Sequence, residues 1–545
     1  MAWWGWGPPA AEREVPEHAL DLLREQLDLD GRGAQAPVAL TEVRLGDSGL
    51  PRALSERLEG ALGVAGVRTD RAARVEHAAG KGYVDLVRLR SGEATGAPDA
   101  VLEPGTEEEV RFALRACHEA AVAVVPFGGG TSVVGGVEPL RGEHAAVVAL
   151  DLGRLDGLLA LDERSLTAVL EPGLRGPEAE RLLNARGLTL GHFPQSYEHA
   201  SIGGYVATRS AGQASTGYGR IDELVLGLRL LAPAGELDLA ARPASAAGPE
   251  LRELLVGSEG ALGVVTRAAL AVRPRPERTR YEGWFFRSFA EGVEALRALE
   301  QAGAAPQVAR LSDEEETRLS FALAGAGGAA ARAGRAYLRA RRYAGGCLAI
   351  AGWEGEAAAV ARRRAQGALL LRRHGGLSLG TAPGSAWSRG RYAAPFLRDA
   401  LLDHGVMVET LETAAQWSEL SAVYRAVGDA LRASLAGLGT PPLVLCHVSH
   451  LYGSGASLYF TFLARQLPGE VIAQWRAAKR AATDAIVAAG GTITHHHAVG
   501  RDHADWMGAE VGETGLRLLQ ALKAELDPRA IMNPGKLLPG YFLAA

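Results

Sequence analysis

The sequence predicts an α+β fold with a helical N-terminal region, two domains and a C-terminal segment. Strand-like apolar runs alternate with Gly-rich turns between residues 94 and 275, and amphipathic helical stretches alternate with further strands between 276 and 490. The start of the chain reads mainly as helices, and its end as helices followed by LDPRAIMNPGKLLPG. The predicted units are therefore 1–93, 94–275, 276–490 and 491–545.

Composition narrows the class of protein. The 545 residues carry 58 Lys and Arg against 63 Asp and Glu, a net charge of −5 that gives no basic footprint for nucleic acid. Three cysteines without CxxC spacing exclude a disulfide framework and a cysteine-rich zinc site. No apolar run approaches the roughly 20 residues of a membrane helix. Because neither a signal peptide, a long leader nor a peroxisomal address is evident, we expect a cytoplasmic protein, with peripheral membrane contact left open.

A strand–helix–strand unit begins near residue 98. In DAVLEPGTEEEVRFALRACHEAAVAVVPF, Thr106 is a candidate N-cap, and the glutamates at 107–109 favour the positive end of a helix. Val110 and Leu114 share one face of that helix. The apolar run 122–127 then predicts a strand that stops at three glycines.

Three Gly-rich segments follow. In PFGGGTSVVGG, successive glycines leave backbone N–H groups uncovered, with the hydroxyls of Thr131 and Ser132 as extra donors. The motif is neither GxGxxG nor GxxxxGK[ST], so it fits a phosphate site or a plain turn. Similar small residues recur at 191–219 and 257–270. Three such segments in one domain favour a large, phosphate-bearing cofactor.

The order of these motifs resembles a known family. PxGGGTSV, SxExxSxGGxxxTRxxG, YG and GSEGxLGV follow one another as in the FAD-binding domain of the vanillyl-alcohol oxidase superfamily. Within it, the chain is most similar to the alkyldihydroxyacetonephosphate synthase family of ether-lipid synthesis. Support comes from nearly the whole chain, in WWGWG, YVDLVRLRSGE, VARLSD, FLRDALL, ETAAQW, YGSGASLYF and HHHAVG.

This resemblance implies a two-subdomain FAD-binding domain and an α+β cap domain that holds the substrate. It implies FAD as the cofactor, and we expect it to be non-covalent because the Gly-rich loop carries no His or Cys. The cofactor-binding residues that it implies are Pro126, Phe127, Gly128, Gly129, Gly130, Thr131, Ser132, Gln195, Ser196, Ser201, Thr208, Arg209, Ser210, Glu259, Gly260, Gly263, Val264 and Val265.

The resemblance also implies a reaction. The family exchanges the acyl group of an acyl-dihydroxyacetone phosphate for a fatty alcohol, and the flavin takes part covalently without net redox change. The expected partner is a lipid-like small molecule, with no nucleic acid and with a homodimer left open. The expected substrate-binding residue is Arg398, and the expected catalytic residues are Tyr459, His495, His496, His497 and Arg310.

The histidine triplet allows three interpretations. A metal site would pair it with His447 and His450, although no neighbouring carboxylate completes a ligand set, and we predict no metal. A purely structural role is the second interpretation. Acid/base catalysis is favoured, because removing a proton beside a carbonyl group and protonating a leaving carboxylate require groups that titrate near neutrality. If residues 490–497 are extended, His495 and His497 share one face.

Two other functions remain open. In the eukaryotic enzymes the position of Gln195 is an aspartate and that of His447 an arginine, which leaves the substrate less certain than FAD. An FAD-dependent dehydrogenase or oxidase of a 2-hydroxy acid, of the D-lactate or glycolate type, would use Arg398 to grip the carboxylate. A non-catalytic flavin-binding sensor would need neither Arg398 nor Tyr459. Tyr459 lies on an apparent strand on which Leu458 and Phe460 face the other way, and it could itself be ordinary packing there.

Overall fold

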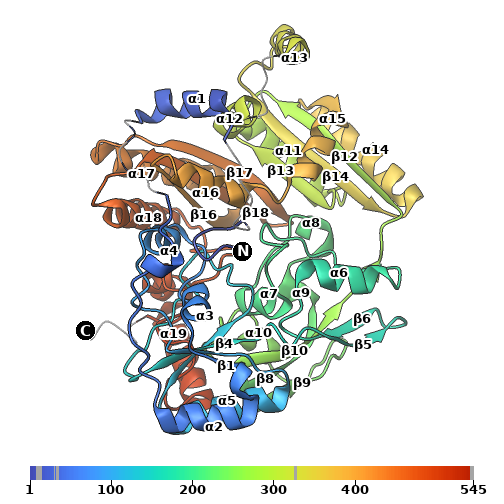
Figure 1. Ribbon diagram of the computed structural model, residues 1–545. Helices are drawn as coiled ribbons and strands as arrows, with labels where there is room; N and C mark the ends of the chain where they lie inside the picture. The colour runs from blue at the N-terminus through green and yellow to red at the C-terminus, as the bar shows by residue number, and fades with distance from the viewer. Residues whose placement is uncertain (8–14, 30, 32, 34–35, 324–327, 540–545) are drawn as a thin grey trace.

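The computed structural model describes the chain except for residues 8–14, 30, 32, 34–35, 324–327 and 540–545. Four β-sheets with surrounding helices give the α+β architecture that the sequence predicts. Figure 1 shows the seven-stranded sheet in the upper half and the smaller sheets in the lower half, with the N-terminus between the halves.

The first lower sheet has the order β1-β2-β4-β3, and β2, β4 and β3 run parallel. Its strands are β1 (Val67–Arg68), β2 (Ala100–Leu102), β3 (Ala123–Phe127) and β4 (Val147–Asp151). Its helices are α2 (Arg52–Leu62), α3 (Arg71–Glu76) and α5 (Glu107–Ala120). Thr106 caps α5 by accepting a 3.2 Å hydrogen bond from Glu109 N, as its sequence predicts.

The second lower sheet is antiparallel, in the order β5-β6-β10-β8-β9. Its strands are β5 (Leu158–Asp162), β6 (Thr167–Leu170), β8 (Val225–Ala232), β9 (Gly235–Leu239) and β10 (Val264–Ala271). The helices of this region are α6 (Gly176–Asn184), α7 (Ile202–Thr208), α8 (Ser215–Tyr218), α9 (Ile221–Leu224) and α10 (Arg252–Leu255). A two-stranded sheet pairs β7 (Leu188–Thr189) with β11 (Arg273–Pro274).

The upper sheet is antiparallel, in the order β15-β12-β14-β13-β17-β18-β16. Its strands are β12 (Arg278–Phe286), β13 (Val308–Ser312), β14 (Cys347–Gly355), β15 (Leu377–Gly380), β16 (Val406–Gln416), β17 (Leu443–Tyr452) and β18 (Gly455–Arg465). One face packs against the main core helices α11 (Phe289–Gln301), α14 (Ala357–Arg373), α17 (Leu420–Gly437) and α18 (Val471–Ala488). The other face meets α1 (Glu17–Leu27), α12 (Glu314–Leu323) and α16 (Ala394–Leu402).

The period of two along a strand decides which side chains reach each face of this sheet. On β18, Leu458 and Phe460 are fully buried in the helix-covered core. Tyr459 between them lies on the opposite face, which borders a cavity. The predicted alternation around Tyr459 is therefore observed.

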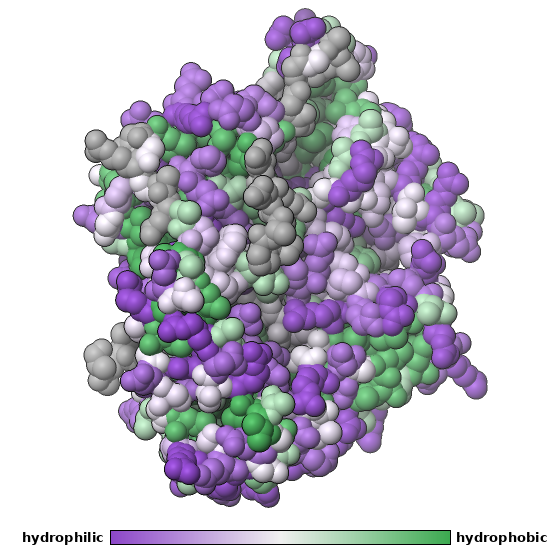
Figure 2. Space-filling view, in the orientation of Figure 1, coloured by the Kyte–Doolittle hydropathy of each residue, from purple (hydrophilic) through white to green (hydrophobic). Residues whose placement is uncertain are grey.

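The remaining helices are α4 (Tyr83–Arg90), α13 (Ala329–Ala340), α15 (Ala382–Gly390) and α19 (Met507–Leu526), with 3₁₀ turns Leu40–Glu42, Val64–Gly66 and Ala504–Trp506. Within the described residues, no helix has the length and apolarity needed to cross a membrane. Most of the face in Figure 2 is hydrophilic, including the surface over α1 and α13.

The C-terminal segment returns to the first lower sheet. Val124 of β3 donates a 2.8 Å hydrogen bond to Ile531 O and accepts one of 2.8 Å from Asn533 N. The side-chain amide of Asn533 also donates to Gly136 O and Glu259 O, at 3.0 and 2.6 Å. Residues far apart in the chain therefore complete one structural unit.

Candidate active site

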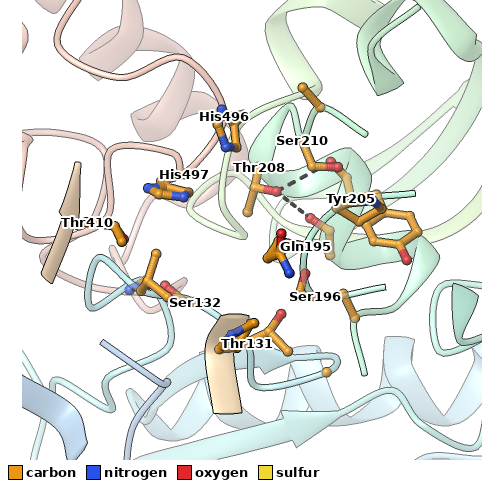
Figure 3. Close-up of a pocket in the computed structure, with 18 of the residues that line it drawn as sticks. Thr131, Ser132, Gln195, Ser196, Tyr205, Thr208, Ser210, Thr410, His496 and His497 are labelled. Atoms are coloured by element: carbon orange, nitrogen blue, oxygen red, sulfur yellow. Dashed lines mark hydrogen bonds between the residues drawn. The ribbon is translucent and has the colours of Figure 1, made fainter. Parts of the chain in front are cut away.

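A cavity of about 440 Å³ is lined by residues of both the lower sheets and the upper sheet. Figure 3 shows Thr131, Ser132, Gln195, His496 and His497 around the same space. Of the residues expected to bind the cofactor or act in catalysis, all line this cavity except Arg209 and His495. The fold thus brings together segments that lie hundreds of residues apart.

The Gly-rich turn after β3 forms one wall. A Cβ atom added at Gly129 would lie 2.3 Å from the carbonyl oxygen of His199, and one at Gly128 would lie 2.3 Å from Ser201 Oγ. Gly130 has φ +65°, which glycine adopts without strain. Within the described part of the chain, no hydrogen bond from the backbone N–H groups of residues 129–131 is found. Uncovered donors on a cavity wall fit the pyrophosphate of FAD.

The second wall comes from residues 195–213. Ser201 caps α7 by accepting a 3.3 Å hydrogen bond from Gly204 N. The hydroxyl of Thr208 donates to Gly204 O at 2.8 Å. Gln195 accepts a 2.9 Å hydrogen bond from the side chain of Gln213. These contacts fix small polar groups along the wall of the cavity.

Arg209 lies outside the cavity lining, although its neighbours Thr208 and Ser210 line it. It ends α7 in the left-handed conformation, with φ +52°. Its guanidinium pairs with Glu253 and donates a 3.1 Å hydrogen bond to Val256 O. The reversal of the backbone at the end of α7 carries this side chain away from its motif neighbours.

Glu259 connects the lower domain to the C-terminal segment. Its carboxylate accepts hydrogen bonds from Val499 N at 2.9 Å and Gly500 N at 2.7 Å. Burial raises the pKa of Glu259 to about 7, against the opposing effect of these two donors. Both carboxylate oxygens of Glu259 therefore bind backbone N–H groups of the protein. Residues 259–260 and 263–265 still line the cavity.

Tyr459 lies among three imidazoles. Its ring is stacked on His447, with centroids 4.9 Å apart, and on His496 at 5.9 Å. His497 meets it edge-on at 5.5 Å. Burial raises the pKa of Tyr459 above its ordinary value, so its phenol is protonated at neutral pH. The tyrosine can therefore donate a hydrogen bond into a site otherwise rich in proton acceptors.

Arg310 forms a charged group with Glu316 and His447. Its guanidinium pairs with the Glu316 carboxylate and lies 3.0 Å from Nε2 of His447. Burial opposes ionisation of Glu316, but His447 and Arg310 lower the pKa of its carboxyl group to about 2. All three residues line the cavity. His447, one of the two positions expected to depart from the eukaryotic enzymes, therefore connects Arg310 to Tyr459.

Arg398, on α16, is 6% exposed and lines the same cavity. It donates a 3.1 Å hydrogen bond to Lys81 O, and its other terminal nitrogen is 3.4 Å from both Glu409 and Thr410. Glu409 balances the buried charge, but a distance of 3.4 Å is long for a charge-assisted hydrogen bond. The guanidinium is therefore able to bind an anionic substrate group more closely.

The histidine triplet differs from the alternation expected of a strand. Residues 495–497 form bends, and His496 and His497 both line the cavity whereas His495 lies behind it. The cause is Glu412 of β16, whose carboxylate accepts hydrogen bonds from the backbone N–H groups of all three histidines. Because three successive backbone N–H groups converge on one carboxylate, the backbone here is not extended. The alternation of side chains along a strand therefore does not apply to the triplet.

Glu412 also belongs to the site, and no sequence motif predicted this. Burial raises the pKa of a carboxyl group, yet the facing His496 and the donors around it hold the pKa of Glu412 well below its ordinary value. Burial lowers the pKa of all three histidines of the triplet below the ordinary value. The triplet is therefore a set of neutral imidazoles around one buried anion. Its sequence signal, ETAAQW, marked the family and gave no role to the acidic residue.

One end of the cavity is apolar. It is lined by residues of α12, α16 and the upper sheet: Leu319, Leu323, Leu397, Leu401, Val408, Leu445 and Leu463. Most of these belong to a cluster that includes buried residues of α1, among them Leu20 and Leu23. The polar centre therefore continues into a branch suited to a hydrocarbon chain.

Trp6, from the WWGWG motif, was not assigned to the site but also lines the cavity. The Asp399 carboxylate accepts a 2.7 Å hydrogen bond from Trp6 N. Lys81 donates to the carbonyl oxygens of Ala2 and Trp3 at 2.8 and 3.0 Å. The N-terminal segment is thus part of the wall beside Arg398.

Comparisons with known proteins agree with this arrangement. Residues 98–239 match the family described as FAD binding domain, and residues 275–537 match FAD linked oxidases, C-terminal domain. The chain is 35% identical over 480 residues to the alkyldihydroxyacetonephosphate synthase of Dictyostelium discoideum, covering 87% of this chain and 78% of that one. For the enzyme of Trypanosoma brucei brucei, the identity is 36% over the same shares. A solved alkyldihydroxyacetonephosphate synthase structure matches with a TM-score of 0.83 at 30% identity, over 98% of both chains. The expected family and fold are confirmed.

Proposed function

Because the chain belongs to the alkyldihydroxyacetonephosphate synthase family of FAD-linked enzymes, we propose that it exchanges the acyl group of an acyl-dihydroxyacetone phosphate for a fatty alcohol. The observation that carries the proposal is the union of a polar centre and an apolar branch in one cavity. Lipid substrates with a phosphate at one end need both parts. A small 2-hydroxy acid has no hydrocarbon chain that would fill the apolar branch.

The residues present fit FAD along the lower walls. The amides of residues 129–131 and the hydroxyls of Thr131 and Ser132 would hold its phosphates, with residues 263–265 along its length. When bound, FAD supplies the flavin ring, with which the substrate carbon reacts reversibly and without net electron transfer. We propose that binding is non-covalent.

The protein's own residues then bind the substrate and move protons. Arg398 binds the phosphate end, and the leucines of α12 and α16 exclude water from the chain. His496 or His497 takes a proton from the carbon that bears the acyloxy group. Neutral imidazoles suit this step, since a protonated ring has no lone pair to offer. Tyr459, protonated and in contact with both, donates a hydrogen bond to the substrate oxygen.

The exchange balances without an oxidant. The bond between the carbon and the acyloxy oxygen breaks and a carboxylate leaves. The oxygen of the fatty alcohol bonds to the same carbon, and its proton is released. The products are an ether and a fatty acid, so no electron acceptor is consumed.

The test is an anaerobic incubation of the purified flavoprotein with an acyl-dihydroxyacetone phosphate and a long-chain alcohol. Ether product should form with no electron acceptor present. In parallel, D-lactate and glycolate are added while flavin absorbance is recorded. If either acid bleaches the flavin stoichiometrically and no ether forms from the lipid, the chain is a 2-hydroxy-acid dehydrogenase or oxidase instead.

A further inference from the structure

His495 has two close polar contacts behind the cavity wall. Its Nε2 atom lies 2.6 Å from the hydroxyl of Tyr452, and its Nδ1 atom lies 2.9 Å from Nδ1 of His496. The ring of His496 lines the cavity, whereas that of His495 does not. Three titratable groups thus form a row that starts at the cavity and leads away from it.

The far end of the row reaches the surface. Tyr452 lines a second, shallow depression together with Gln416, Ser454 and Glu510. These last three residues are exposed. The row therefore spans the wall between the cavity and a groove lined by exposed residues.

The hydrogen-bond directions along the row follow from Arg220. Burial raises the pKa of Tyr452, and the nearby guanidinium of Arg220, which can only donate, opposes that rise. The Tyr452 hydroxyl then donates to Nε2 of His495. A neutral His495 carries its proton on Nδ1 and donates it to Nδ1 of His496, which leaves the proton of His496 on Nε2.

A metal ion is the competing interpretation of these imidazoles. Ligand atoms of His450, His495 and His496 lie within 4.8 Å of one another. Two nitrogens 2.9 Å apart, each about 2.0–2.1 Å from zinc, would subtend about 90° rather than a tetrahedral angle. A separation of 2.9 Å is, in contrast, the usual length of an N–H···N hydrogen bond. The second nitrogens of His450 and His495 already face Ser215 and Tyr452.

We propose that His496, His495 and Tyr452 form a proton relay between the cavity and the surface groove. The proposal rests on the proposed function, in which a histidine of the cavity exchanges protons with the substrate. When Nε2 of His496 gives up its proton, Nδ1 of His496 receives one from His495. Nε2 of His495 then receives one from Tyr452, and Tyr452 receives one from water. One proton leaves at the cavity, one enters at the groove, and each group keeps its total. Nε2 of His496 then has a free lone pair, and the same transfers in reverse carry a proton taken from the substrate carbon out to the groove.

His495 and Tyr452 are positioning residues in this scheme, since neither touches the substrate. The relay explains why the triplet contains a histidine off the cavity. It also predicts that a hydrogen removed from the substrate carbon is replaced by one from solvent. Without the relay, the removed proton would remain on His496 and return to the carbon.

The test runs the exchange reaction in deuterium oxide and measures deuterium at the substrate carbon for each turnover. Tyr452→Phe keeps the ring and removes the hydroxyl. We expect it to retain FAD and to lower deuterium incorporation per turnover at least tenfold. The control Tyr337→Phe, at an exposed position on α13, should incorporate deuterium like the wild type. Dividing by turnover separates the relay from a general loss of activity, which a structural defect would also cause.

Equal incorporation by Tyr452→Phe and the wild type would overturn the relay. So would loss of activity with a chelator and its return with zinc, which would show an ion on the three imidazoles. If the wild type forms no ether at all, the proposed function fails on its own. The relay is then decided on the compound that bleaches the flavin: it requires a solvent isotope effect that Tyr452→Phe changes, and an unchanged effect would reject it.

Discussion

The carboxylate of Glu412 accepts a 2.8 Å hydrogen bond from the backbone N–H of His497 and lies 3.6 Å from Nδ1 of the same residue. One buried anion thus holds the backbone of a cavity histidine by a hydrogen bond and faces the ring of the same residue. Glu412 belongs to the upper sheet and His497 to the C-terminal segment. The shape of the active site therefore depends on a contact between two parts of the chain that fold as separate elements.

Replacing Glu412 with Gln should lower both stability and turnover. Gln keeps one acceptor oxygen but loses the charge that strengthens several hydrogen bonds, each worth about 1.5–3 kcal/mol. We expect the free energy of unfolding to fall by about 2–3 kcal/mol, with FAD still bound and turnover strongly reduced. Urea unfolding and the anaerobic ether assay measure the two effects.

Glu510→Gln is the matched control for that variant. The exposed carboxylate of Glu510 accepts from Thr492 Oγ1 at 2.7 Å and Ile493 N at 3.1 Å, in the same segment. It should change stability by less than about 1 kcal/mol, as exposed contacts usually do. Wild-type turnover in Glu412→Gln would show that the carboxylate only supports the fold.

The Gly-rich turn should tolerate no side chain at Gly129. Even a Cβ atom would lie 2.3 Å from His199 O, and an aspartate would add negative charge at the proposed pyrophosphate site. Gly129→Asp and Gly129→Ala should both be purified without stoichiometric FAD, measured by absorbance after denaturation. Gly235→Ala, on β9 with nothing within 4 Å of the new Cβ, should keep full occupancy. If the Gly129→Asp protein is purified with bound FAD, the phosphates of FAD bind elsewhere.

The apolar branch should set the chain length of the lipid. Leu445 is 6% exposed and lines the branch, so Leu445→Trp would shorten the space for a hydrocarbon chain. We expect KM for a long-chain alcohol to rise about tenfold, equivalent to about 1.4 kcal/mol, with a smaller change for a short one. The exposed Leu438→Trp is the control. An unchanged chain-length profile, with FAD retained, would mean that the lipid binds elsewhere.

Buried neutral histidines should make the protein sensitive to mild acid. Burial lowers the pKa of His503 to about 3. In the unfolded chain its pKa is about 6.5, so below this pH only the unfolded state gains the proton. Stability is complete above pH 6.5 and is lost as pH falls towards 3, at about 1.4 kcal/mol per pH unit for this group.

His503→Asn measures that contribution. Asn can still donate to Ala498 O, which Nδ1 of His503 reaches at 3.1 Å. Between about pH 7 and 5, the wild type should lose about 2 kcal/mol more free energy of unfolding than the variant. His18→Asn, at an exposed site, is the control for the substitution itself. Parallel curves for His503→Asn would show that His503 takes up its proton in the folded protein over the same pH range as in the unfolded chain.

The sequence predicted local features well. The Thr106 cap, the strand before the glycines and the alternation around Tyr459 depend only on residues that are near neighbours in the chain. The family motifs likewise named residues that meet in one cavity. Periodicity and capping are short-range effects, so they can be read from a few consecutive letters.

Contacts between distant segments were not predictable in this way. Nothing near His495–His497 shows that Glu412, more than eighty residues earlier, collects their amides. The same applies to Arg209, whose motif neighbours line the cavity while its own side chain turns to Glu253. Side-chain direction in a turn depends on partners that only the folded chain brings close.

The hydrogen bonds of Val124 to Ile531 and Asn533 have a consequence for biosynthesis. A ribosome delivers β3 early, but the partners of this strand emerge only after the whole upper sheet has been made. The FAD-binding domain therefore cannot complete its fold while the nascent chain is still growing. Its edge stays open to non-native pairing until residues 531–533 are released, and we expect flavin to be loaded after translation rather than during it.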